Sequence, residues 1–570
     1  MANRASHLLL ALLLASACNQ QRTSDASAVD GKQNASGESA ESDDASQERE
    51  DTSHDAPPPD AERAALDPTP ATTATVDPRV DAPLREEAIR RALVDLAEWT
   101  KKKGGTLGAS IVDVRDGRRV AAVEAARPLN PASNQKILTA AAALHYLGPA
   151  YRFKTELRGN PKNGVAEVIV LSGNGDPSLG TQDLWRLARV VRERGLKRVG
   201  AVYVDQSYFD DQFVPPAFEQ QPNEWAAFRA PVSAVAVEQN TVTLNVLPNA
   251  SGTAASFWFE PPGAVDSHGT IATRAPGSGD AVGWSLRPDD APGATRLRSE
   301  VSGGIAADLG RRRYTRRLED PRLVPGYALR EVLKDVGIEV GDEVRLGKLP
   351  SSEQLAYITS KPLAQLLYPV GKESDNFYAE MLLKVVGAAA NADGKATPPA
   401  TTAAGARALV RWLEGAKIDT KDVVVANGSG LFDANRVSAG VLAEALAAAY
   451  REPAISSEMV AQLAIGGVDG TLRNRFRDLA GQRVVRAKTG TLRNVIALSG
   501  YVMGPAGRAP IAFSLLVVGV PAEPGEARKR SDRVVTEIAK ALWAAPQPQS
   551  APERPSQQEG TSRDAQPSAP

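Results

Sequence analysis

The chain has 570 residues, of which 42% are hydrophobic, and its 67 Lys and Arg nearly balance 68 Asp and Glu. This length allows two or three domains with large cores, and the balanced charge gives no indication of a nucleic-acid partner. A single cysteine and four histidines exclude an internal disulfide, a cysteine-ligated zinc site and an HExxH metal centre, so we expect no metal and no other cofactor.

The N-terminus, residues 1–18, has the pattern of an export signal. A basic residue precedes a short apolar run at 8–14, which is too short to cross a bilayer. The segment 15–18, Ala-Ser-Ala-Cys, resembles a bacterial lipobox in which alanine replaces the usual leucine. We predict a periplasmic protein anchored by a lipid on Cys18, the only membrane attachment we expect. Conventional cleavage after Ala17 is the alternative.

Two polar segments flank the expected fold. Residues 19–81 consist mainly of Ser, Ala, Asp, Glu and Pro, which cannot bury enough apolar surface to offset the entropy of ordering. We therefore predict a disordered acidic tether there and a second disordered tail at 547–570. The fold should lie between residues 82 and 546, where no stretch has the pattern of a transmembrane helix.

The first part of the fold, 82–150, combines helices with a hairpin. Apolar spacing predicts a helix at 84–103. Two β-rich runs, 107–114 and 119–125, are joined through Asp116-Gly117, a strong hairpin signal. An apolar helix follows at 137–147.

Residues 151–320 have the pattern of short strands joined by turns, and helical patterns return after residue 320. In the middle region short Val-rich strands alternate with turn residues, and one helix is predicted near 182–195. The predicted strands there are 165–171, 199–205 and 234–247. Beyond residue 320 the predicted helices are 327–336, 362–367, 374–386, 403–414, 438–449 and 527–543, and the predicted strands are 483–491, 495–502 and 511–518. This order predicts an α+β fold in which one domain, formed by 82–150 and 321–546, is interrupted by an inserted β-rich region at 151–320.

Three short motifs occur in order along this fold. The first, Ser133-Asn134-Gln135-Lys136, opens a predicted helix and places the serine and the lysine on one face. Exposed N–H groups at the helix start would favour an alkoxide on Ser133. Lys136 can act as a base only if burial or nearby cations lower its pKa. On its own, the motif Ser-x-x-Lys is expected to occur by chance in a chain of this length. Most such matches lie on a solvated helix surface.

The second motif is Ser374-Asp375-Asn376, at the start of another amphipathic run. A serine there can relay a proton to a leaving amine, and the Asn376 amide can hold a substrate carbonyl. A similar Ser172-Gly173-Asn174 ends a predicted strand before Gly-Asp-Pro, and we interpret it as a turn.

The third motif, Lys488-Thr489-Gly490, ends a predicted strand. Lys488 can bind a carboxylate and lower the pKa of Lys136, and Gly490 would let a substrate backbone approach the strand edge. Alone this motif is more often a strand end that turns into a hairpin. The rarity of histidine and cysteine, together with the order of the three motifs, favours the catalytic interpretation.

At these residues the chain resembles the D-alanyl-D-alanine carboxypeptidase/endopeptidase branch of the penicillin-binding proteins, the class C low-molecular-mass or penicillin-binding protein 4-like group (serine peptidase family S13). The resemblance spans about residues 85–545. Further stretches that carry it include 175–179, 205–209, 230–234, 427–431, 435–438, 467–472 and 488–492.

The resemblance implies a β-lactamase/transpeptidase-like domain, an antiparallel sheet flanked by helices, interrupted by two small inserted β-rich domains. It implies that a D-Ala-D-Ala peptide or cross-link of peptidoglycan acylates Ser133 and is then hydrolysed, and that β-lactams inhibit the enzyme. The N–H groups of Ser133 and Thr491 would bind the oxyanion, with Thr489 and Gly490 contacting substrate. Two positions depart from the family pattern. Asn427 replaces an acidic residue. The region that binds the diamino-acid side chain of the substrate in some relatives is Asn223-Glu224-Trp225 here, so Glu224 is a candidate for that role.

Two other functions remain open on the sequence. A class A-like serine β-lactamase uses the same three motifs, but its first two lie far closer than the 241 positions (374 − 133) that separate Ser133 from Ser374. A non-catalytic peptidoglycan-binding lipoprotein is the other alternative, although such a protein usually loses one of the motif residues.

Overall fold

The computed structural model describes residues 84–288, 296–390 and 396–544. The predicted signal with Cys18, the tether at 19–81 and the tail at 547–570 lie outside these residues. In the described part of the chain, no helix combines the length and apolarity needed to cross a bilayer.

A six-stranded antiparallel sheet joins the two ends of the fold, in the order β17-β18-β19-β20-β1-β2. Its strands are β1 (Thr106–Asp113), β2 (Arg119–Val123), β17 (Ala464–Ile465), β18 (Val485–Leu492), β19 (Val495–Val502) and β20 (Ile511–Val518). Every residue of β19 is buried, because helices cover both faces of the sheet. Strands from opposite ends of the chain are therefore neighbours.

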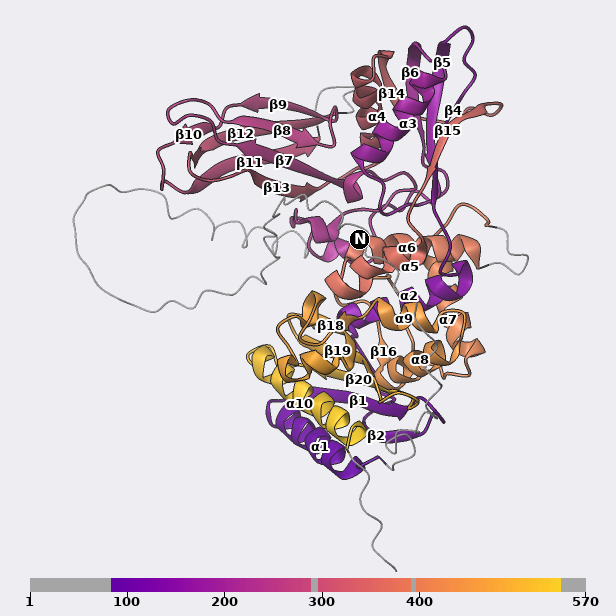
Figure 1. Cartoon of the computed structure of the whole chain (residues 1–570), viewed down its shortest axis with the longest axis vertical. Coiled ribbons are helices and arrows are strands. Elements are labelled where there is room, and N and C mark those ends of the chain that lie inside the picture. The colour runs from indigo at the N-terminus through magenta and orange to yellow at the C-terminus, as the bar shows by residue number, and fades with distance from the viewer. Residues whose placement is uncertain (1–83, 289–295, 391–395, 545–570) are drawn as a thin grey trace, which may run out of the picture. The chain divides into compact units, whose positions relative to one another are not determined.

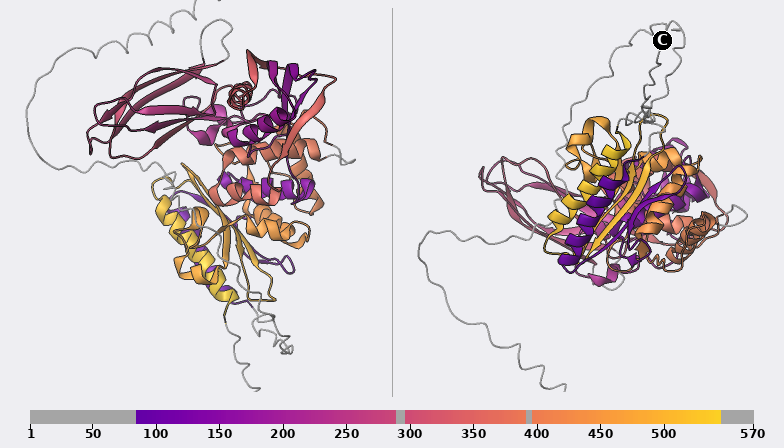
Figure 2. Two further views of the ribbon diagram at one scale, coloured as in Figure 1. Left: turned by 45° about the horizontal axis from the view of Figure 1, so that its top comes forward. Right: turned by 90° about the horizontal axis from the view of Figure 1, so that it is seen from below.

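The two terminal helices pack side by side on one face of this sheet. They are α1 (Glu86–Lys102) and α10 (Pro524–Leu542), and Figure 2 shows them together. Ile89 and Leu93 of α1 share a buried cluster with Val534 and Ile538 of α10 and with strand residues. This side of the sheet is a structural core.

Helix α8 (Ala439–Arg451) packs against the other face of the sheet, and further helices pack around and behind it (Figure 1). These are α2 (Gln135–Leu147), α5 (Leu363–Tyr368), α6 (Asn376–Ala389), α7 (Thr402–Gly415) and α9 (Ser456–Ala461). In α2 a run of four alanines is fully buried, and their small side chains allow α6 to pack closely against the helix. A two-stranded ribbon of β3 (Pro128–Leu129) and β16 (Val437–Ser438) borders this layer.

A second sheet of five strands has the order β14-β6-β5-β4-β15. Its strands are β4 (Lys154–Gly159), β5 (Val165–Gly173), β6 (Arg198–Asp205), β14 (Glu339–Leu346) and β15 (Glu353–Thr359), and the helices α3 (Thr181–Glu193) and α4 (Val324–Asp335) share its core. The sequence predicts that the inserted region ends at residue 320. Because β14 and β15 pair with β6 and β4, we propose that this region continues to about residue 359.

Two smaller sheets form a third unit. One, β13-β7-β8, contains β7 (Thr241–Leu247), β8 (Ser256–Glu260) and β13 (Arg312–Arg317). The other contains β9 (Val265–Gly269), β10 (Ala272–Arg274), β11 (Asp280–Pro288) and β12 (Leu297–Ala306). Leu244 of β7 and Val301 of β12 belong to the same buried cluster, so the two sheets share a core.

The predicted α+β class is confirmed, and the predicted helices and strands agree with the structure apart from their ends and one strand. The strand predicted at 234–247 begins only at Thr241. Residues Glu238, Gln239 and Asn240 adopt positive φ angles in a tight turn that alternating hydrophobicity does not reveal.

Candidate active site

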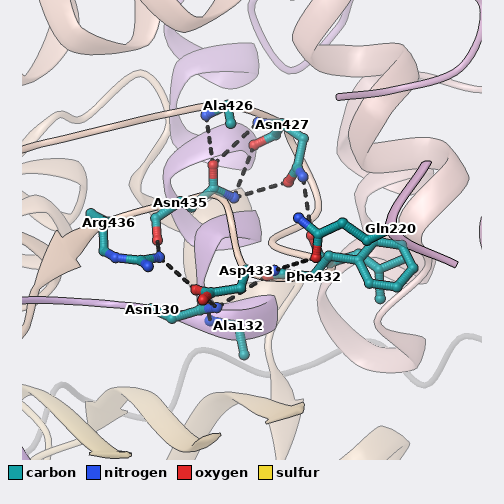
Figure 3. Close-up of polar contacts among 10 residues, drawn as sticks. Asn130, Ala132, Gln220, Ala426, Asn427, Phe432, Asp433, Asn435 and Arg436 are labelled. Carbon is teal, nitrogen blue, oxygen red and sulfur yellow. Dashed lines mark hydrogen bonds and ion pairs between the residues drawn. The ribbon is translucent and has the colours of Figure 1, made fainter. Parts of the chain in front are cut away.

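Ser133 lies in a short 3-10 turn, Ala132–Asn134, that leads into α2. Ala132 has a positive φ of 46°, and its N–H donates to Oδ1 of Asn130 at 2.8 Å. The Asn130 amide in turn donates to the carbonyl of Phe432 at 3.0 Å (Figure 3). These bonds hold a strained turn that leaves Ser133 partly exposed at the helix start.

Lys136 is 1% exposed and directs its ammonium group to three oxygens. Nζ lies 3.0 Å from Oγ of Ser133, 2.7 Å from Oδ1 of Asn376 and 2.8 Å from the carbonyl oxygen of Ser429. The predicted Ser133–Lys136 contact is therefore present. Asn376 of the second motif joins it across 240 positions of sequence.

Burial lowers the pKa of Lys136 to about 7, against the opposing effect of the Glu380 and Asp375 carboxylates. Burial is one of the two conditions under which Lys136 can act as a base. A neutral amine has two N–H bonds and one lone pair, and the oxygens of Asn376 and Ser429 can only accept hydrogen bonds. Both N–H bonds therefore stay with these oxygens, and the lone pair faces Ser133.

The second motif is shaped by a break between two helices. A π-helical turn, Pro369–Glu373, ends at Ser374, which has a positive φ of 64°. Asp375 then caps α6 by accepting the N–H of Tyr378 at 3.0 Å. Asn376 is thereby the first residue of α6. In the described part of the chain, no hydrogen bond links the Ser374 hydroxyl to Ser133 or Lys136.

The inserted region reaches this site through its backbone. Nδ2 of Asn376 donates to the carbonyl oxygen of Phe228 at 3.0 Å, while its Oδ1 accepts from Lys136. The orientation of the Asn376 amide is thus set from both sides. The sequence did not indicate the role of Phe228, because a main-chain carbonyl leaves no side-chain pattern.

Lys488 of the third motif is 1% exposed on β18, and its Nζ donates to the carbonyl of Thr489 at 3.0 Å. Burial and, to a lesser degree, the Lys136 ammonium hold the pKa of Lys488 well below its usual value. Because this repulsion is mutual, it favours states in which only one of the two lysines is charged.

The first and third motifs lie side by side. The hydrogen-bond partners orient the Asn134 amide to donate to the Lys488 carbonyl at 2.9 Å and to accept from the Ser499 hydroxyl at 2.6 Å. A Cβ on Gly490 would lie 3.1 Å from both Cβ of Ala132 and the carbonyl of Pro131. Asn134 therefore links the first motif to the third. The sequence motif contains this residue but does not reveal its role.

One edge of β18 is open at this point. Strand β17 pairs only with Arg486 and Ala487, so within the described residues no strand pairs with that side of 488–492. Thr491 is exposed, and Oγ1 of Thr489 donates to Oγ1 of Thr471 at 2.9 Å. The geometry leaves room for an extended peptide along Thr489, Gly490 and Thr491.

A loop that the sequence did not include in the site supplies the third acceptor of Lys136. Figure 3 shows part of its polar network, in which Nδ2 of Asn435 donates to Oδ1 of Asn427 at 2.9 Å. Oδ1 of Asn427 accepts from the N–H of Gly430 at 2.9 Å, and its Nδ2 donates to the carbonyls of Leu431 and Pro216, each at 3.1 Å. A carboxylate could not make the two donor bonds, which gives a physical account of the asparagine in place of an acidic residue.

Glu224 lies in the segment that also carries Phe228. Its carboxylate accepts the N–H of Ala226 at 2.9 Å, and its carbonyl accepts from Arg229 and Arg317. Its predicted role in substrate binding stays a prediction. Among the described residues, no cluster of three or more His, Cys, Asp or Glu side chains could hold a metal ion.

Solved structures share this fold. Penicillin binding protein 4 (dacB) of Haemophilus influenzae superposes with a TM-score of 0.62 at 23% identity, covering 78% of this chain and 99% of that protein. A second structure of the same protein, complexed with a β-lactam, gives a TM-score of 0.58 over 78% of this chain and 97% of that protein.

Curated sequences give the family. A D-alanyl-D-alanine carboxypeptidase of Actinomadura sp. strain R39 is 32% identical over 447 residues, which are 75% of this chain and 80% of that protein. The D-alanyl-D-alanine carboxypeptidase DacB of H. influenzae is 25% identical, covering 75% of this chain and 89% of that protein. A family match extends over residues 91–540. The chain therefore belongs to the D-Ala-D-Ala carboxypeptidase 3 (S13) family.

Proposed function

We propose that this enzyme cleaves D-Ala-D-Ala stem peptides and cross-links of peptidoglycan through an acyl-enzyme on Ser133. The observation that carries the proposal is the placement of Lys136 Nζ, 3.0 Å from Oγ of Ser133 and bonded to two carbonyl oxygens on its other sides. Family membership supports the reaction class, which is that of a serine-type carboxypeptidase.

Acylation begins with a proton transfer. The lone pair of Lys136 takes the hydroxyl proton of Ser133 while Oγ attacks the carbonyl carbon of the penultimate D-alanine. The N–H groups of Ser133 and Thr491 stabilise the oxyanion that forms. The Lys136 ammonium then donates its new proton toward the leaving amine, with the Ser374 hydroxyl as relay.

Substrate recognition uses the open edge of β18. An extended peptide hydrogen-bonds beside Thr489 and Gly490, where the absence of a side chain on the glycine permits close approach. The terminal carboxylate pairs with Lys488. This charge partner favours the protonated form of a lysine that burial otherwise disfavours.

Deacylation by water completes the cycle. With Ser133 acylated, Lys136 again holds a free lone pair and accepts a proton from the attacking water. β-Lactams enter the same path, since the H. influenzae relative is known in complex with one.

For location we propose the periplasm, with a lipid on Cys18. The short apolar run and the position of the chain's only cysteine support this proposal.

Fluorescent penicillin tests the assignment on the full-length protein. We expect a stable label that is lost in Ser133→Ala, together with D-alanine release from a disaccharide pentapeptide. Rapid turnover of the label would instead indicate a β-lactamase. No label and no release would indicate a non-catalytic binding protein.

A further inference from the structure

Three polar residues follow one another along the buried face of α6. Asn376, Glu380 and Lys384 are spaced by four residues each, so they lie one above another on the helix. Glu380 is 1% exposed and Lys384 is fully buried. Asn376 contacts Lys136, and Lys384 pairs with Asp210 at 2.5 Å. Glu380 lies between these two contacts.

Glu380 binds the backbone of the loop that supplies the third acceptor of Lys136. Oε2 accepts the N–H of Gly428 at 2.9 Å, and Oε1 accepts the N–H of Ser429 at 2.8 Å. The carbonyl of Ser429 then accepts from Lys136 at 2.8 Å. The buried carboxylate of Glu380 is thus linked to Lys136, the proposed base, through the backbone of Ser429.

We propose that Glu380 is a positioning residue for acylation. Its carboxylate fixes the Ser429 carbonyl, which directs the lone pair of Lys136 at Ser133, and its negative charge helps decide the pH at which Lys136 loses its proton. This inference rests on the proposed role of Lys136 as base.

The geometric part of the argument concerns rotation of the amine. Without a fixed Ser429 carbonyl, the neutral amine of Lys136 could turn one N–H toward Ser133 and lose its ability to accept a proton. No side-chain acceptor replaces this carbonyl, because the three bonds of Nζ go to Ser133, Asn376 and Ser429. By fixing the backbone of this loop, Glu380 therefore orients the amine of Lys136.

The electrostatic part requires all charges near Lys136. From α6, Glu380 and Asp375 both favour its charged form as carboxylates, while burial raises the pKa of both carboxyls and the backbone N–H groups that each accepts oppose this rise. On β18, burial and the Lys136 ammonium disfavour the charged form of Lys488, and Glu373 favours it. Lys384 also faces Glu380 but is neutralised by Asp210. Changing Glu380 alone leaves the other groups in place.

The test compares acylation rates by fluorescent penicillin across about pH 5–9 in the full-length protein, for the wild type, Glu380→Gln and Glu380→Asp. In Glu380→Gln, loss of the charge should shift the onset of acylation to lower pH by about one unit. The plateau rate should also fall about tenfold or more, because an amide N–H replaces one acceptor. Glu414→Gln, an exposed change on α7, should leave both unchanged.

Glu380→Asp keeps the charge but withdraws the carboxylate by one methylene. We expect the wild-type onset with a lower plateau. A wild-type onset in Glu380→Gln would overturn the electrostatic role, and a wild-type plateau in Glu380→Asp would overturn the positioning role. If the wild type itself showed no acylation, the proposed function would fail instead, so the two failures are distinguishable.

Discussion

The chemistry of this site depends on one lysine that is buried and yet fully hydrogen-bonded. Lys136 is 1% exposed, and its Nζ lies within hydrogen-bond distance of oxygens of Ser133, Asn376 and Ser429. Burial without charged partners would exclude an ammonium group, and exposure would keep it protonated at neutral pH. Lys136 is buried but keeps hydrogen-bond partners, so it can exist in both the neutral and the charged form, as a general base must.

Replacing Lys136 by methionine should lower the acylation rate by about 10² to 10⁴, the usual contribution of a general base. The folded state should persist, since methionine fills a similar buried volume. Penicillin labelling gives the rate and thermal unfolding gives the stability. Lys102→Met, at an exposed lysine of α1, is the control. Near-normal labelling of Lys136→Met would exclude its role as base.

The pH profile of acylation should report the same group. Because burial lowers the pKa of Lys136 to about 7 and only the neutral amine accepts a proton, the rate should rise about tenfold per unit below pH 7 and level off above it. Stopped-flow measurement of penicillin acylation between about pH 5 and 9 checks this. A rate that falls as the pH rises would contradict the assignment.

The loop around Gly430 packs directly against the nucleophile turn. Gly430 has a positive φ of 78°, and a Cβ there would collide with the carbonyl oxygen of Ala132. Close backbone approach and a left-handed conformation both require glycine. This contact places the Ser429 carbonyl within reach of Lys136.

Gly430→Ala should therefore impair both stability and acylation, the latter by more than about tenfold because the Ser429 carbonyl moves. Gly148→Ala is a matched control, since Gly148 has a similar φ of 79° but open space around it. That change should cost about 1 to 3 kcal/mol of stability, because alanine is strained in this backbone conformation, and should leave acylation intact. Equal acylation defects in the two variants would show that backbone conformation alone, and not the contact with Ala132, matters.

Helix α6 is held at its far end by a buried ion pair with the inserted region. Lys384 donates to Asp210 at 2.5 Å and to the carbonyl of Gln212 at 2.6 Å. Burial lowers the pKa of Lys384, and Asp210 opposes this effect. The pair thus keeps an otherwise unfavourable charge inside the protein.

Asp210→Asn should lower the free energy of unfolding by about 3 kcal/mol at pH 7, because a buried cation loses its partner. The loss should shrink as the pH rises toward the pKa of unfolded lysine, where Lys384 is neutral in both folded proteins. Denaturant titrations at several pH values measure this. Asp422→Asn, at an exposed carboxylate that takes no part in this ion pair, is the control. An unchanged unfolding free energy in Asp210→Asn would contradict the prediction.

Across the molecule, distant segments of the chain complete one site. The first strands of the fold and the last ones form a single sheet, and the inserted region supplies the Phe228 carbonyl that holds Asn376. This arrangement explains how 241 positions can separate two motifs that meet around one lysine.

The proposed anchor predicts the behaviour of the whole protein in the cell. Cys18→Ser should release the enzyme from the membrane fraction to the soluble periplasmic fraction, while penicillin labelling of Ser133 continues. Cell fractionation measures where the protein is located, and the mass of the mature N-terminus shows whether Cys18 carries a lipid. An unmodified Cys18 in the wild type would indicate conventional cleavage after Ala17.

Local patterns were sufficient to predict most elements and the motif residues. Apolar spacing predicted α1, α8 and α10, and turn residues predicted the β1–β2 hairpin. Both kinds of signal come from neighbours in sequence, which is why they can be read without a structure. The strand predicted at 234–247 was wrong in its first half, where backbone conformation overrides hydrophobic alternation.

Ser133 and Lys136 show which properties of the site the sequence contains and which depend on the tertiary structure. Their spacing and the presence of Asn376 and Lys488 later in the chain are properties of the sequence. The depressed pKa of Lys136, the Ser429 and Phe228 carbonyls and the buried carboxylate of Glu380 arise only when segments hundreds of residues apart pack together. Burial and main-chain contacts are collective results of packing, and for this reason tertiary structure alone decides them.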